Sequence, residues 1–179
     1  MPILTGSVVV VALVVSGYLL LKPLSVSAHV ISAPAKLGGY VNDPALASTS
    51  DAKGLRTQIV KGAAGEVKNV ISAVYEKSTG AGTGTGPQII VFIGGNLIGS
   101  SSAASVISGF MTQTHGSFTT SAGILGGQAA CAPSRRGRLA ECAWADDDTF
   151  GVIISPTLTV AGLATELREL RPLVEHVAK

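Results

Sequence analysis

The first part of the chain is apolar or small at every position. Residues 2–21 contain no charged side chain, and the run ends at Lys22 and Pro23. About 20 residues at ~1.5 Å each span the ~30 Å hydrocarbon layer of a bilayer. The lysine suits the membrane interface, and the proline cannot continue a helix. The pattern predicts one transmembrane helix within residues 1–22, which attaches the chain to a membrane.

A cleavable signal peptide is the alternative to a membrane anchor. Val26, Ser27 and Ala28 fit the small-residue rule for signal peptidase, with cleavage after Ala28. Residues 1–7 contain no lysine or arginine, however, and the apolar run exceeds the roughly 7–15 residues usual in a signal peptide. The sequence therefore favours an uncleaved signal anchor.

The two cysteines, Cys131 and Cys142, have ten residues between them, and both have short apolar neighbours. This spacing predicts two strands joined by a loop, with a disulfide bond at its base. The chain has no Cys-x-x-Cys motif, and no histidine stands at metal-ligand spacing from either cysteine. A disulfide favours an oxidising compartment, so we expect the folded domain on the extracytoplasmic side of the membrane.

Three later segments repeat apolar residues at intervals of three and four, which is typical of helices. They are residues 52–78, a stretch beginning near residue 103, and residues 159–177. Ser101 or Ser102 can cap the second helix, and Thr157 or Thr159 can cap the third. Pro172 is expected to kink the last helix or to end its first half.

Other segments read as strands because β-branched and apolar residues alternate with turn signals. They are a short strand near residues 38–41, a buried strand at 88–93, and strands at 122–132, 138–144 and 149–155. We therefore predict an α+β fold with a mainly antiparallel sheet and helices packed on one face. It occupies residues 37–179 and follows the transmembrane helix through a linker at 23–36.

The junction between the buried strand and the second helix is the strongest candidate for a ligand site. It contains Gly94, Gly95, Gly99, Ser101 and Ser102. Backbone N–H groups at a helix start favour anions. The glycine spacing is not the dinucleotide fingerprint, and no phosphate-loop lysine follows. A tight turn without a ligand is the favoured alternative.

Two charged clusters are candidates for contacts. Arg135, Arg136 and Arg138 lie between the cysteines, where they either solvate a loop tip or contact a partner. Asp146, Asp147 and Asp148 could supply oxygen ligands to a cation, but the spacing of a calcium loop is missing. A solvated hairpin turn is the favoured interpretation, and no metal site is predicted.

The composition and the motif content argue against several classes of function. Only 13% of the residues are charged, against roughly 25% in typical soluble domains, and the formal net charge is +2. A clustered basic face for nucleic acid is therefore not expected. His29, His115 and His176 fall in the linker, at a helix end and in the last helix. No Gly-x-Ser-x-Gly elbow, His-Glu-x-x-His helix or Cys-x-x-Cys-His motif is present, so we predict no catalytic residues and no cofactor.

Three segments resemble a known group of proteins. They are Gly126–Cys131, Cys142–Asp146 and Thr149–Val152, and Leu167-Arg168 adds a further likeness in the last helix. They look like corresponding segments of streptomycete and related actinobacterial proteins that are membrane-anchored or secreted. The resemblance implies the disulfide and the extracytoplasmic address. It implies no activity.

We therefore expect a non-enzymatic module that is anchored in the membrane and acts as an accessory subunit or protein-binding domain of an envelope complex. A surface poor in charge is compatible with partner contact. The alternative is a domain, or an enzyme, that binds a small molecule or anion at residues 94–102. A component of a phage or secretion machine is a third possibility.

Overall fold

The computed structural model describes residues 29–49, 52–62, 66–78, 86–98, 102–134 and 139–178. The predicted membrane segment at 1–22 and the three arginines of the basic cluster lie outside these residues. Within the described ranges, no helix is both long and apolar enough to cross a membrane.

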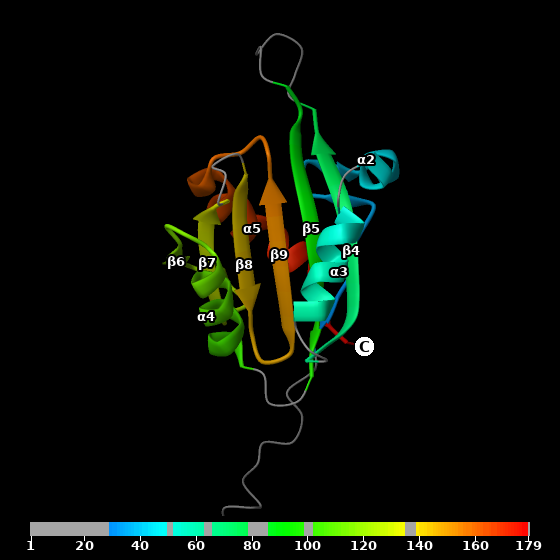
Figure 1. The fold of residues 1–179 in the computed structure, drawn as a ribbon. Helices are drawn as coiled ribbons and strands as arrows, with labels where there is room; N and C mark the ends of the chain where they lie inside the picture. The colour runs from blue at the N-terminus through cyan, green and yellow to red at the C-terminus, as the bar shows by residue number, and fades with distance from the viewer. Residues whose placement is uncertain are drawn as a thin grey trace, which may run out of the picture.

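An eight-stranded sheet forms the centre of the domain (Figure 1). Its spatial order is β2 (Lys36–Leu37), β3 (Tyr40–Asn42), β4 (Val67–Lys77), β5 (Gln88–Leu97), β9 (Thr149–Ser155), β8 (Ala140–Ala145), β7 (Gln128–Pro133) and β6 (Phe118–Thr120). Every neighbouring pair is antiparallel. A separate antiparallel ribbon joins β1 (His29–Ile31) to β10 (Glu175–Val177). The predicted α+β class with an antiparallel sheet is confirmed.

Helices cover both faces of this sheet, so the predicted single helical layer is wrong. Helix α5 (Val160–Val174) and strand β1 pack on one face, whereas α3 (Ala52–Gly62) and α4 (Ala103–Gln113) pack on the other. A short helix, α2 (Pro44–Thr49), lies beside β4. Side chains alternate along a strand, so Phe92 of β5 joins the α5-side core and Ile93 joins the opposite core. A strand that is buried on both faces has a nearly continuous run of apolar residues in the sequence, and other elements must pack on both sides of it.

The helix predicted over residues 52–78 is wrong in its second half. Helix α3 ends at Gly62, and β4 pairs with β5 from Val67 opposite Leu97 to Lys77 opposite Gln88. A bulge interrupts this pairing, and Asn69 within it has a φ of 53°. Because the segment is rich in β-branched residues, it fits a pleated surface better than a helix.

The last helix begins where predicted and ends differently. Thr159 caps α5 by accepting a hydrogen bond from the Gly162 amide at 3.1 Å. Pro172 lies in the last turn and does not divide the helix, which continues to Val174. The chain then becomes β10, which pairs with β1, so the predicted helix over 159–177 is three residues too long.

The segment predicted as a strand at 122–132 becomes regular only at Gln128. Three glycines in the preceding loop, Gly123, Gly126 and Gly127, have φ values of 88°, 73° and 81°. These values lie in the left-handed region, which glycine adopts without a steric penalty. The loop places its carbonyl groups over the α5 side of the sheet, where they take part in the polar cluster described below.

The predicted disulfide is confirmed. Cys131 of β7 and Cys142 of β8 are directly opposite in the sheet, with their Cα atoms 4.1 Å apart. Both are fully buried in the core that faces α5. Trp144 lies in the same core, and its ring stacks on Phe92 at 6.0 Å between centroids.

Candidate functional site: an apolar groove and a buried polar cluster

The face of the sheet that carries α3 and α4 contains a groove. Helix α3 packs on β4 and β5, and α4 packs on β7 and β8. Strand β9 lies between these two helices, as Figure 1 shows. The resulting cavity has a volume of about 850 Å³, and its floor is formed by β8 and β9.

The groove is mainly apolar. Val152 and Ile154 of β9 lie on the floor, Ile59 of α3 forms one wall, and Val106 and Phe110 of α4 form the other. Four of these side chains are only partly buried, although they adjoin the core. Partly exposed apolar side chains that gather in one concave surface are typical of a ligand or partner site.

The charged residues that line the groove are acidic. Glu66 and Glu141 both line it, and no lysine or arginine does so among the residues that the structure describes. Neutral polar side chains, such as those of Gln58 and Thr114, also line it. Burial raises the pKa of the Glu141 carboxyl. The groove therefore suits a largely apolar ligand that carries hydrogen-bond donors.

Gly94 and Gly95 do not form the predicted turn, because both lie inside β5. A Cβ atom on Gly94 would come within 2.8 Å of the Phe92 ring, and one on Gly95 would come within 2.9 Å of the Lys68 carbonyl oxygen. Close packing of β1 and β4 against β5 explains these glycines without a ligand.

The rest of the predicted anion site is only partly within the described structure. Ser102 caps α4 as predicted, and its hydroxyl accepts a hydrogen bond from the Ser105 amide at 3.2 Å. Gly99 and Ser101 lie outside the described residues. Anion binding at the start of α4 stays a prediction.

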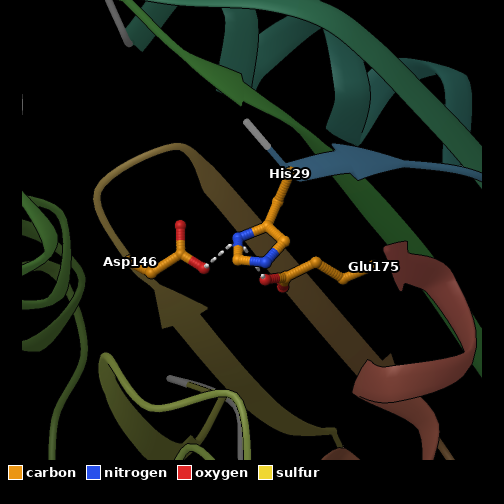
Figure 2. Close-up of side chains that lie close together, drawn as sticks. All are labelled: His29, Asp146 and Glu175. Carbon is orange, nitrogen blue, oxygen red and sulfur yellow. Dashed lines mark ion pairs between the residues drawn. The ribbon is translucent and has the colours of Figure 1, made fainter. Parts of the chain in front are cut away.

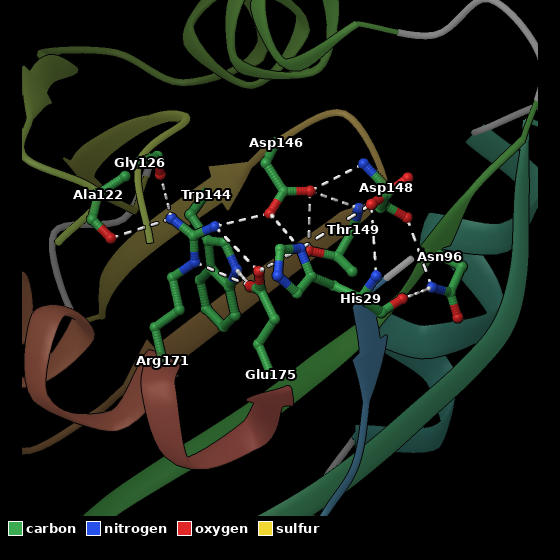
Figure 3. Close-up of polar contacts among 10 residues, drawn as sticks. All are labelled: His29, Asn96, Ala122, Gly126, Trp144, Asp146, Asp148, Thr149, Arg171 and Glu175. Carbon is green, nitrogen blue, oxygen red and sulfur yellow. Dashed lines mark hydrogen bonds and ion pairs between the residues drawn. The ribbon is translucent and has the colours of Figure 1, made fainter. Parts of the chain in front are cut away.

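A buried polar cluster lies on the opposite face of the sheet, centred on Arg171 (Figure 3). The Arg171 side chain is 0% exposed. Its guanidinium donates to both carboxylate oxygens of Glu175, at 2.8 and 3.2 Å, and to Asp146 Oδ2 at 2.8 Å. It also donates to the carbonyl oxygens of Ala122 and Gly126. These five bonds match the five N–H donors of an arginine side chain.

Neighbouring donors fix the two carboxylates. Trp144 Nε1 donates to Glu175 Oε2 at 3.1 Å. Asp146 Oδ1 accepts from the amides of Asp148 and Thr149 at 2.8 and 2.7 Å, and from the Thr149 hydroxyl at 3.1 Å. The predicted turn at residues 146–148 is present between β8 and β9, but Asp146 is not a solvated turn residue.

His29 completes the cluster from β1 (Figure 2). Its Nδ1 atom lies 3.9 Å from Asp146 Oδ2, 3.9 Å from Asp148 Oδ2 and 3.8 Å from Glu175 Oε1. The backbone of His29 is held on both sides, because its amide donates to Asp148 Oδ2 at 3.3 Å and its carbonyl accepts from Asn96 Nδ2 at 2.8 Å. His29, Asp146 and Glu175 offer one metal-ligand atom each within 4.8 Å of one another.

The two carboxyls that contact Arg171 have opposite pKa shifts. Burial raises the pKa of Glu175, and the nearby Asp146 raises it further against the opposing effect of Arg171. Burial alone would also raise the pKa of Asp146. The contacts of Asp146 with Glu175, with the two turn amides and with Arg171 outweigh the effect of burial, and the pKa of Asp146 is lowered. The cluster therefore holds more acid than its one arginine can neutralise.

The sequence pattern predicts a linker at His29 and indicates no site role for Arg171 or Glu175. The three residues meet only because β1 pairs with β10. A signal for two of them exists: Arg171 stands four residues after Leu167, on the apolar stripe of α5, and is followed at the i+4 position by Glu175. The other two histidines, His115 and His176, are exposed.

Comparisons with protein-family models, with curated proteins and with solved structures found no match to this chain.

Proposed function

We propose that this chain is a non-catalytic, membrane-anchored module on the extracytoplasmic side, and that its groove between α3 and α4 binds an amphipathic helical segment of a partner protein in the envelope. The groove is the observation that carries this proposal. The address rests on the apolar run at residues 2–21 together with the disulfide between Cys131 and Cys142.

A helix suits the groove because it would complete the layer of helices on this face of the sheet. On this face α3 and α4 cover the two sides of the sheet and leave β9 between them. Helix-in-groove recognition places apolar residues at helical spacing into an apolar cleft. Val106 and Phe110, one helical turn apart on α4, present such a surface, and Val152 forms the floor opposite.

The acids that line the groove favour a segment that also carries lysine or arginine. Glu66 and Glu141 are lining residues, and charge complementarity at the edge of an interface contributes specificity and association rate. A small amphiphile is the competing occupant, because a volume of about 850 Å³ lies within the range of small-molecule sites.

Site-specific photo-crosslinking tests the proposal in the cells from which the gene comes. A photoreactive amino acid replaces Val152 on the groove floor, and a control carries it at Thr165, which is exposed on α5 on the other face. We expect the Val152 probe to capture one protein at an apolar segment that contains basic residues, and the Thr165 probe not to capture it. Capture of lipid or small molecules alone, or the same products from both positions, would contradict the proposal.

A further inference from the structure

We propose that His29, Asp146 and Glu175 bind one divalent transition-metal ion of the Zn²⁺ type. The site joins the first described strand, the turn between β8 and β9, and the last strand. It lies on the face of the sheet opposite the groove, so the inference is independent of partner binding there.

The donor atoms converge at distances that suit a bound ion. One ligand atom each of His29, Asp146 and Glu175 lies within 4.8 Å of the other two, and His29 Nδ1 lies 3.9 Å from Asp146 Oδ2 and 3.8 Å from Glu175 Oε1. These separations exceed the range of a hydrogen bond. In a tetrahedral zinc site with bonds of about 2.0–2.2 Å, ligand atoms lie roughly 3.3–3.6 Å apart. A shift of roughly 1 Å or less would therefore bring the three donors to a common ion, with a water molecule as the fourth ligand.

The chemical type of the donors indicates the ion. One imidazole nitrogen with several carboxylate oxygens is a ligand set that zinc accepts, whereas calcium and magnesium prefer oxygen alone. Charge points the same way. The carboxylates of Asp146, Glu175 and the neighbouring Asp148, together with one guanidinium, carry a formal charge of −2 when His29 is neutral, and a divalent cation balances it.

The surrounding hydrogen bonds hold the carboxylates in place. Arg171 and Trp144 orient Glu175, and Arg171 with the turn amides orients Asp146. Outer hydrogen bonds of this kind are a regular feature of metal sites. Arg171 donates to Asp146 Oδ2 and Glu175 Oε1 themselves, and each carboxylate oxygen has a second lone pair for the ion.

The ion would fasten β1 to the core. His29 is the first described residue, and its strand contacts the domain through β10, β5 and β9. The competing arrangement has no ion, and a protonated His29 then lies among the carboxylates as an ion pair. Both arrangements use the same residues, so metal binding itself must be measured.

The test uses the full chain in a mild detergent, without a histidine tag and after treatment with a chelator. Isothermal titration calorimetry measures Zn²⁺ binding, and the visible absorption of added Co²⁺ reports the ligand geometry. His29→Phe removes the nitrogen donor but keeps an aromatic ring, and Asp146→Asn removes the charge of one ligand. His176→Phe is the matched control, because it removes an exposed histidine from β10.

We expect one Zn²⁺ per chain, an affinity at least tenfold lower in His29→Phe and Asp146→Asn, and an unchanged affinity in His176→Phe. Tryptophan fluorescence confirms that each variant is folded, and the result for Asp146→Asn tests the site if His29→Phe does not fold. Absence of saturable binding by the wild-type chain, or binding that survives in Asp146→Asn and a folded His29→Phe, would overturn the site in favour of the ion pair.

Discussion

Arg171→Leu is expected to be among the most destabilising substitutions in the domain. The leucine fills part of the arginine volume but provides none of the five N–H donors. The carboxylates of Glu175 and Asp146 then remain in the cluster without their cation, and the carbonyl groups of Ala122 and Gly126 lose their donor. Glu175 has a side-chain exposure of 0%, so water cannot replace the arginine there.

The magnitude follows from these losses. Breaking a buried ion pair by removing one partner costs about 3–5 kcal/mol. Each carbonyl that loses its donor adds about 1 kcal/mol unless water reaches it. We therefore expect the free energy of unfolding to fall by about 5 kcal/mol. This is a large part of the roughly 5–15 kcal/mol typical of a domain.

Urea unfolding monitored by the fluorescence of Trp144 measures this loss, because the chain has one tryptophan and it is buried in the α5-side core. Arg168→Leu is the matched control on the same helix and should change the free energy by less than about 0.5 kcal/mol. Arg171→Leu combined with Glu175→Leu should recover part of the loss, since it removes the isolated charge. A loss in Arg171→Leu as small as that in the control would refute the reasoning.

Three further predictions concern stability. Gly151→Ala should lower the free energy of unfolding by about 3 kcal/mol, because an added Cβ atom would overlap the buried indole ring of Trp144. In Gly109→Ala the added Cβ atom meets no other atom within 4 Å, so the free energy of unfolding should rise by about 0.5–1 kcal/mol. Equal effects of the two substitutions in urea unfolding would contradict this packing. Cys131→Ala combined with Cys142→Ala should lower the free energy of unfolding by about 3 kcal/mol. A reducing agent without denaturant should leave the disulfide intact, because both cysteines are fully buried. Rapid reduction of the folded chain would contradict this burial. Folding lowers the pKa of Asp146, so the stabilisation that its carboxylate provides is complete above the unfolded pKa of about 4 and is lost as the pH falls through the folded pKa. Asp146→Asn should therefore be less stable than wild type at pH 7, and the difference in the free energy of unfolding should shrink in acid. A difference independent of pH would contradict the assigned pKa shift.

Helices and strands that are determined by neighbouring residues could be predicted from the sequence. The strand at 88–93 is a β-branched run between turn residues, and Ser102 and Thr159 cap the helices that follow them. The disulfide also followed from spacing and neighbouring residues, because two strands joined by a loop bring their cysteines opposite each other. These features need no knowledge of distant parts of the chain.

Strand β4 shows why the period of apolar residues can mislead. Ile71, Ala73 and Tyr75 belong to the α5-side core, while Val70 and Val74 are buried on the other side. A strand that is buried on both faces does not alternate apolar with polar residues, so its spacing also fits a helix. Pairing with β5 determines the outcome, and that pairing is a tertiary contact.

The polar cluster and the groove could not be predicted as sites because each is assembled by contacts between distant parts of the chain. His29 and Glu175 stand near opposite ends of the chain and meet through the pairing of β1 with β10. The groove exists because α3 and α4 leave β9 between them, which depends on the strand order of the sheet. Sequence reasoning instead chose Gly94 and Gly95, whose small size serves packing inside β5.

The most direct test of the proposed function closes the groove without disturbing the fold. Gly109 lines the groove on α4, and the space at its Cβ position is open, so Gly109→Phe should obstruct the groove and Gly109→Ala should leave it open. The quantity to measure is the yield of the crosslinked partner from a photoreactive residue at Val152 in each background. We predict a yield at least tenfold lower with phenylalanine and unchanged with alanine. Equal yields in the two variants would contradict binding in the groove.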